Sequence, residues 1–225
     1  MMPRPATTPR VKICCIASIE EAQLAIRRGA SAVGLVSEMP SGPGPIPDAR
    51  IAAIARTIPP GVSSFLLTCK LDAASIILQQ RALRTTALQL VDSVPADVYR
   101  SLRDSLPGIS LVQVIHVRDR SAVEEAIRYA PHVDAILLDS GNQTLAVKEL
   151  GGTGRVHDWT ISRKIRESIG VPMYLAGGLT AGNVREAIET VSPFGVDVCS
   201  GVRTNGCLDE RKLGEFFDAV HKAHS

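Results

Sequence analysis

The sequence predicts an α/β protein of one domain, with eight parallel strands closed into a barrel and helices around it. First, short apolar runs rich in β-branched residues alternate with amphipathic helical segments along the chain. Second, strict alternation of this kind implies a parallel sheet. Third, eight such units in a chain of 225 residues, 45% of them hydrophobic, fit a TIM (β/α)8 barrel. An open doubly wound sheet is the alternative, because periodicity alone does not report closure.

The elements follow one another with short connections. We expect a disordered Pro-rich tail over residues 1–10 and a barrel domain over residues 11–225. The β-branched apolar runs predict strands at Val11–Ile16, Ala32–Ser37, Ser63–Cys69, Ala87–Val91, Ser110–Val117, Asp134–Ser140, Met173–Gly177 and Val196–Ser200. The amphipathic segments predict helices at Ser18–Arg28, Pro47–Ile58, Asp72–Leu83, Pro95–Leu106, Asp119–Tyr129, Thr160–Ser168, Asn183–Val191 and Asp209–Ala223. Ser18, followed three residues later by Glu21, is typical of a helix N-terminus.

Two connections are longer than the others. Residues 38–46 follow the second predicted strand and are rich in Pro and Gly, and residues 141–158 follow the sixth. Both lie at the C-terminal end of the barrel strands. Long loops in a compact domain are usually lids or binding loops, so both are candidates to cover a ligand. The alternative is a surface insertion without function.

Composition and charge exclude several classes of protein. The net charge of +2, with both signs interspersed, argues against a nucleic-acid or anionic membrane partner. No apolar stretch reaches the roughly 18 residues that span a bilayer, and no secretory signal is evident, so we expect a cytoplasmic protein. The five cysteines, odd in number and without metal-type spacing, predict reduced thiols. The scattered histidines give no reason to expect a metal site.

Glycines close the last two predicted strands, in the runs MYLAGGL and GVDVCSGV. Glycine after a strand lets backbone N–H groups approach an anion, and in eight-fold barrels the loops after strands seven and eight commonly bind phosphate. Gly177 and Gly178, with Ser200 and Gly201, are therefore the candidate phosphate-binding residues.

Two side chains at strand ends are candidates for catalysis. Alternation along the first strand places Lys12, Cys14 and Ile16 on one face, so Cys14 reaches the barrel mouth if that face points inward. A cysteine in an apolar strand is by default a small core residue. Asp139 ends the sixth strand, at the face where barrel enzymes carry their catalytic groups.

Several motifs in one order strengthen these assignments. The chain resembles the phosphoribosylanthranilate isomerase family, whose members read KICG, LLD, GGTG-K-x-x-DW, GGL-x-x-x-NV and VDVSSGVE. The corresponding runs here are VKICCI, LLDS, GGTGRVHDW, LAGGLTAGNV and GVDVCSGV. The resemblance implies a TIM barrel, no cofactor and no metal, and an Amadori rearrangement of a phosphoribosyl amine. It also implies a small phosphorylated sugar-amine as substrate and a monomer or homodimer.

The same resemblance assigns roles by position. Cys14 matches the general base, Asp139 the general acid, and the four residues at the two glycine-rich loops match the phosphate site. Arg155 stands where the family usually has lysine and can offer a cation to the ligand. The acid opens the ribose ring to a Schiff base, and the base then removes the C2′ proton. Neither step is a redox reaction or a hydrolysis.

The chain departs from the family pattern at three places. The family loop FYP-x-SPR carries an arginine that clamps the aryl carboxylate, whereas residues 37–46 contain no basic residue; Arg203 is a candidate replacement. A lost bidentate contact of about 1.5–3 kcal/mol would weaken binding about ten- to a hundred-fold. Cys15 replaces the glycine of KICG, and QLVD, residues 89–92, replaces QLHG.

Three functions remain open from the sequence. The first is a phosphoribosylanthranilate isomerase with a divergent aryl-carboxylate loop. The second is a paralogue that performs the same rearrangement on another phosphoribosyl amine. The third is a non-catalytic phosphosugar-binding barrel, although such a binder needs neither Cys14 nor Asp139.

Overall fold

The computed structural model describes residues 8–141 and 156–223, and it forms a closed barrel of eight parallel strands. Each strand pairs with the next along the chain, and β8 pairs with β1. The strands are β1 (Arg10–Ile13), β2 (Ala32–Val36), β3 (Ser63–Thr68), β4 (Ala87–Leu90), β5 (Ser110–His116), β6 (Ala135–Asp139), β7 (Met173–Leu175) and β8 (Gly195–Val198). The predicted barrel is confirmed, and the open sheet is wrong.

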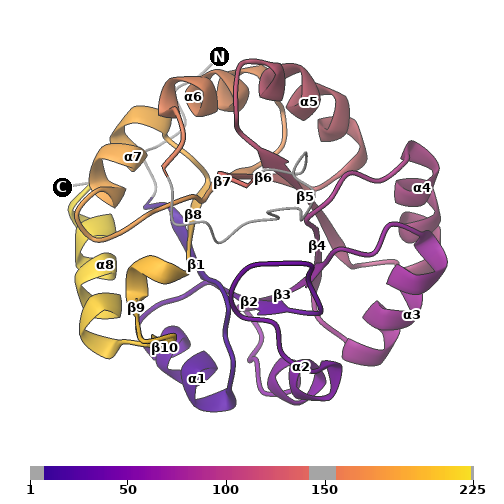
Figure 1. Cartoon of the computed structure of the whole chain (residues 1–225), viewed down its shortest axis with the longest axis horizontal. Coiled ribbons are helices and arrows are strands. Elements are labelled where there is room, and N and C mark those ends of the chain that lie inside the picture. Colours follow the sequence, from indigo (N-terminus) through magenta and orange to yellow (C-terminus); the bar gives the residue numbers. More distant parts are fainter. Residues whose placement is uncertain (1–7, 142–155, 224–225) are drawn as a thin grey trace.

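Helices surround the ring of strands (Figure 1). They are α1 (Ile19–Arg27), α2 (Asp48–Ala55), α3 (Ala73–Leu83), α4 (Ala96–Ser105), α5 (Ser121–Tyr129), α6 (Trp159–Ser168), α7 (Val184–Val191) and α8 (Glu210–Lys222). The predicted cap of α1 is present, since the Ser18 hydroxyl accepts from the Glu21 amide at 3.2 Å. Every predicted helix is found within three residues of its expected ends.

Some boundaries and small elements differ from the prediction. Arg10 is the first residue of β1, so the barrel begins one residue earlier than expected; residues 1–7 of the predicted tail lie outside the described residues. Most strands end earlier than predicted because their last residues turn into the loops that form the site. The 3₁₀ turns η1 (Ala130–His132) and η2 (Ser200–Val202) and the hairpin of β9 (Arg203–Thr204) and β10 (Cys207–Leu208) are too short for periodicity to reveal.

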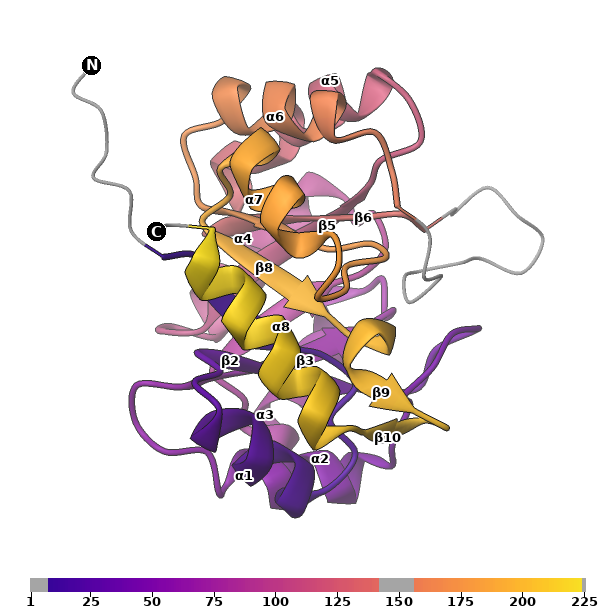
Figure 2. The same cartoon turned by 90° about the vertical axis from the view of Figure 1, so that its left-hand side faces the viewer.

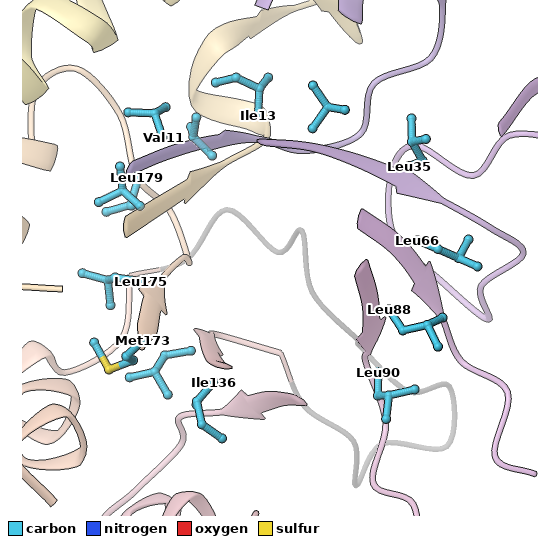
Figure 3. Close-up of a cluster of buried hydrophobic side chains, with 14 of the residues drawn as sticks. Val11, Ile13, Leu35, Leu66, Leu88, Leu90, Ile136, Met173, Leu175 and Leu179 are labelled. Atoms are coloured by element: carbon cyan, nitrogen blue, oxygen red, sulfur yellow. The ribbon is translucent and has the colours of Figure 1, made fainter. Parts of the chain in front are cut away.

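The strands carry two apolar layers. One side of each strand packs against the surrounding helices, and Figure 3 shows Val11, Ile13, Leu35 and Leu66 pointing away from the barrel centre. A second, smaller cluster that includes Phe65 and other strand residues fills the interior. Because successive side chains alternate between the two faces of a strand, both layers come from the same short runs.

The C-terminal ends of the strands carry the loops that shape the site. The loop after β2 and the hairpin of β9 and β10 project from the same end of the barrel (Figure 2). Within the described ranges, no helix has both the length and the apolar character needed to cross a membrane.

Candidate functional site

A cavity that opens to solvent lies at the C-terminal ends of the strands. Its wall includes Cys14 from the end of β1, Asp139 from β6, Gly177 and Gly178 after β7, and Ser200 after β8. The structure thus brings together five of the eight site residues predicted from the sequence. This end of an eight-fold barrel is where such proteins bind their ligands.

Cys14 lies beside a buried ion pair. The Lys12 ammonium is fully buried and donates to the Asp197 carboxylate at 2.8 Å. Burial by itself lowers the pKa of Lys12, but the Asp197 carboxylate and the neighbouring thiols outweigh it, and the net shift is upward. A charged ammonium is thereby held next to the Cys14 sulfur.

Gly34 on β2 makes room for this arrangement. A Cβ added there would lie 2.8 Å from the Cys14 sulfur and 3.1 Å from the Lys12 nitrogen. Only a residue without a side chain therefore lets both groups occupy this part of the barrel.

Cys15 breaks the alternation expected for the first strand. Its φ of 60° lies in the left-handed region, which L-residues with a side chain rarely adopt. The turn brings Cys15 into the cavity wall beside Cys14 instead of to the opposite face. Its side chain packs on the loop after β2, where a Cβ added to Gly44 would lie 2.6 Å from the Cys15 Cβ. A bare Gly44 therefore accommodates the side chain that replaces the expected glycine.

Asp139 is half-buried at the cavity rim. One carboxylate oxygen accepts from the Ser140 amide at 2.7 Å. The His157 ring lies near enough to interact electrostatically with this carboxylate, and its Nε2 is 2.7 Å from the Ser162 hydroxyl. Burial lowers the pKa of His157, against the opposing effect of Asp139, so the ring favours its neutral form.

The two glycine-rich loops contact each other through their backbones. Gly177 and Gly178 have φ values of 87° and 63°, and Asn183 holds their loop by donating to the Gly178 carbonyl at 3.0 Å. Gly201 packs against the neighbouring loop, since an added Cβ would lie 2.0 Å from the Leu179 carbonyl oxygen. The short turn η2 follows β8 directly, as in the phosphate sites of other eight-fold barrels. Gly201 thus joins the two loops, while Ser200 faces the cavity.

Arg203 does not reach the cavity, contrary to the role suggested for it. Its guanidinium pairs with Glu21 at 2.9 Å and donates to the Cys15 carbonyl at 2.6 Å. A third contact goes to the Gly206 carbonyl at 2.9 Å. With both terminal nitrogens engaged and its side chain only 8% exposed, Arg203 ties α1 and the hairpin to the end of β1.

The aryl end of the predicted pocket has an apolar wall. Met39 and Pro43 from the loop after β2 line the cavity with Val36 and Leu67, and no basic residue from that loop is present. Arg155, the other predicted cation, lies outside the described residues. Among the described residues, no lysine or arginine lines the cavity.

Sequence reasoning gave no role to Gln89 or Asp197, yet both line the cavity. Gln89 is 3% exposed, and its carbonyl oxygen has no hydrogen-bond partner among the described residues. Since a buried polar atom normally has a partner, this oxygen is available to a ligand. The only sequence signal for Gln89 was its place in β4, on the side of that strand that faces the barrel interior. Over residues 8–141 and 156–223, no cluster of three or more metal-type side chains occurs.

Comparison with known proteins decides the family. The sequence model described as N-(5'phosphoribosyl)anthranilate (PRA) isomerase matches residues 11–219. The chain belongs to this family. The isomerase of Methanocella arvoryzae is 37% identical, over 94% of this chain and 97% of its own length. The N-(5'-phosphoribosyl)anthranilate isomerase 2 of Methanosarcina mazei is 38% identical, over 95% and 93%.

Solved structures of the family share the fold. The phosphoribosylanthranilate isomerase of Thermotoga maritima superposes with a TM-score of 0.82 at 29% identity, covering 95% of this chain and 99% of that one. Another structure of the family, in complex with reduced 1-(o-carboxyphenylamino)-1-deoxyribulose 5-phosphate, gives 0.79 at 27% identity with the same coverage. The resemblance that the motifs indicated is confirmed.

Proposed function

We propose that this isomerase converts N-(5'-phosphoribosyl)anthranilate into 1-(o-carboxyphenylamino)-1-deoxyribulose 5-phosphate, with Asp139 as general acid and Cys14 as general base. The observation that carries the proposal is that both side chains line one cavity with the glycine-rich loops. A non-catalytic binder would need the loops but neither side chain. The substrate is a small phosphorylated sugar-amine.

The first step opens the sugar ring. Asp139, in its protonated form, gives a proton to the ring oxygen of the ribose while the bond from that oxygen to C1′ breaks. The amine nitrogen supplies the electron pair, so a protonated Schiff base forms between nitrogen and C1′. The carboxyl group at the rim is placed for a ligand that enters from solvent. Positioned acids of this kind contribute about 10²- to 10⁴-fold.

The second step moves a proton from carbon. The Cys14 sulfur accepts the C2′ proton, which the Schiff base has made acidic, and an enolamine results. The enolamine then tautomerises to the ketone, so no net oxidation occurs and no electron acceptor is needed. The Lys12 ammonium beside Cys14 stabilises the sulfur while it is negative, before it takes the proton.

The glycine-rich loops anchor the phosphate in this proposal. Gly177 and Gly178 after β7 present backbone at the cavity wall, and Ser200 adds a hydroxyl at the start of η2. Backbone amides and the start of a helical turn suit an anion. Gly201 supports the site by keeping the two loops in contact.

The anthranilate end distinguishes this chain within the family. Since Arg203 is engaged with Glu21, the carboxylate of the substrate has no arginine among the described residues that line the cavity. Arg155, outside the described residues, is our proposed replacement. The paralogue alternative rests on the same observation: an amine without an acidic group would meet only the apolar wall.

Turnover of phosphoribosylanthranilate tests the proposal. The substrate is generated in place, and the loss of its fluorescence is followed. We expect Cys14→Ala and Asp139→Asn each to lower kcat about 10²- to 10⁴-fold. Cys207→Ala and Asp218→Asn, at exposed positions, are the matched controls and should keep full activity. Turnover that survives both active-site changes would contradict the assigned roles.

A second substrate distinguishes the proposed phosphoribosylanthranilate isomerase from the paralogue. A phosphoribosyl amine made from aniline lacks the carboxylate. We expect slower turnover of this amine than of the anthranilate compound, and Arg155→Met should reduce the difference. Faster turnover of the aniline compound would instead support the paralogue. We place the enzyme in the cytoplasm, where its thiols stay reduced, as a monomer or a homodimer.

A further inference from the structure

Three thiols meet at the cavity wall, and the proposed mechanism uses only one of them. Cys14 and Cys15 leave the end of β1, and Cys199 leaves the end of β8, the strand paired with β1. The sulfur atoms of Cys15 and Cys199 lie 2.7 Å apart. All three thiols are free in this structure.

We infer that Cys15 and Cys199 are a reversible redox pair, which a hydroperoxide converts into a disulfide across the active-site wall and thereby switches the isomerase off. The bond itself does not depend on the proposed function, whereas its effect on turnover does.

Proximity is the first argument. An S–S bond of about 2.05 Å requires the two sulfurs to move about 0.65 Å closer than their 2.7 Å separation. The neighbouring backbone is already fixed, because the Cys14 amide donates to the Val198 carbonyl at 2.8 Å. Little rearrangement of the two strand ends is therefore needed.

The two thiols also differ in their chemistry. The hydrogen bond between Cys199 and Cys15 lowers the pKa of Cys199, and the Arg203 guanidinium adds to this effect, whereas burial opposes it. Hydrogen bonds to Cys14 and Cys199, together with burial, raise the pKa of Cys15. Cys199 is thus the more easily deprotonated thiol, which reacts first with an oxidant, and Cys15 is the thiol that resolves the product. Redox-sensing cysteines commonly have such a low-pKa partner next to a resolving one.

The oxidant reaches this pair through the cavity. Cys199 is partly exposed, and both Cys199 and the buried Cys15 line the open pocket. The Cys199 sulfur gives up its proton and attacks one peroxide oxygen, and the O–O bond breaks. The departing hydroxide takes that proton, so a sulfenic acid and one water form. The Cys15 sulfur then attacks the sulfenic sulfur, the S–O bond breaks, and a second water leaves. The two thiols together lose two electrons and two protons, and hydrogen peroxide accepts these electrons and protons as it becomes two waters.

The disulfide would disturb both the catalytic base and the phosphate loop. Cys15 is adjacent to Cys14, and Cys199 is adjacent to Ser200 at the phosphate loop. Cys15 also packs on the loop after β2 through Gly44. The two sulfurs close by about 0.65 Å, and the part of this movement that the adjacent peptides take up moves the base relative to the anchored sugar. Because a misplacement of about 1 Å can cost about 10²-fold in rate, we expect at least a tenfold loss of kcat/KM.

Peptide mapping tests the bond without reference to activity. The full chain is treated with hydrogen peroxide, the remaining thiols are alkylated, and the denatured protein is digested with trypsin. We expect residues 13–27, with Cys14 alkylated, joined to residues 186–203, at a mass two hydrogens below the sum of the two peptides. The joined peptide should be absent from Cys15→Ser and Cys199→Ser and present in Cys207→Ser, which changes an exposed thiol.

Turnover measured on the same samples tests the switch. Each protein is compared with its own activity before oxidation. The parent and Cys207→Ser should lose at least tenfold in kcat/KM and regain it with dithiothreitol, whereas Cys199→Ser should be resistant. Absence of the joined peptide from the oxidised parent, or its persistence in Cys15→Ser through Cys14, overturns the redox pair. A joined peptide with unchanged turnover overturns the switch. A parent without any turnover would refute the proposed function while the peptide map still decides the disulfide.

Discussion

Replacing Lys12 with methionine leaves the Asp197 carboxylate without its partner inside the barrel. Lys12 is fully buried, Asp197 is 7% exposed, and the pair is 2.8 Å long. The Lys12 nitrogen also lies 5.4 Å from the centre of the Phe65 ring, an apolar neighbour that leaves Asp197 as the ion-pair partner of the ammonium. Methionine is similar in volume, so the change removes the charge without opening a large cavity.

The expected loss is large because both charges are desolvated. Removing one partner of a buried pair costs about 3–5 kcal/mol, since the other charge stays buried and uncompensated. For a chain of this size, about 2–4 °C of Tm corresponds to 1 kcal/mol. We therefore expect Lys12→Met to lower Tm by about 6–20 °C. Guanidinium chloride unfolding, followed by far-ultraviolet circular dichroism, measures the free energy directly.

Two further variants sharpen the comparison. Arg185→Met removes an exposed pair with Glu189 of similar length, 2.7 Å, and should cost only about 0.3–0.5 kcal/mol. The double change Lys12→Met with Asp197→Leu removes both buried charges and should recover most of the loss. The reasoning is refuted if Lys12→Met costs no more than Arg185→Met, or if the double variant is less stable than the single one.

Two other changes probe the site and its support. Gly34→Ala should lower kcat at least tenfold and stability by about 1–3 kcal/mol, because the new Cβ crowds the Cys14 sulfur at 2.8 Å; Gly170→Ala, with nothing within 4 Å, should change neither. Glu21→Gln tests how stability depends on pH in acid. Burial raises the pKa of Glu21, but Arg203 and two backbone amides outweigh it and hold the pKa below the usual 4.5. This stabilisation is present above pH 4.5 and lost as pH falls, so the variant's unfolding free energy should depend less on pH below about 4.5. An unchanged slope in acid, or equal effects of the two glycine changes, would contradict these expectations.

The sequence by itself determined the order of elements and most of the site. Alternation of β-branched runs and amphipathic helices is a local property, so eight strands and eight helices could be placed within a few residues. Asp139 and the glycine-rich loops end strands, and in a parallel barrel all strands end at one mouth. Their meeting in one cavity therefore follows from the topology alone.

Closure of the sheet and the partners of individual side chains were decided only by the tertiary structure. From the sequence, Arg203 could pair with a ligand or with a protein carboxylate. It pairs with Glu21 because the packing of the barrel brings α1 close to the segment that follows β8. The position of Cys15 depends on one backbone angle, and its contact with Cys199 joins residues 184 positions apart. Such long-range contacts depend on packing in three dimensions, and the periodicity of a short strand carries no information about them.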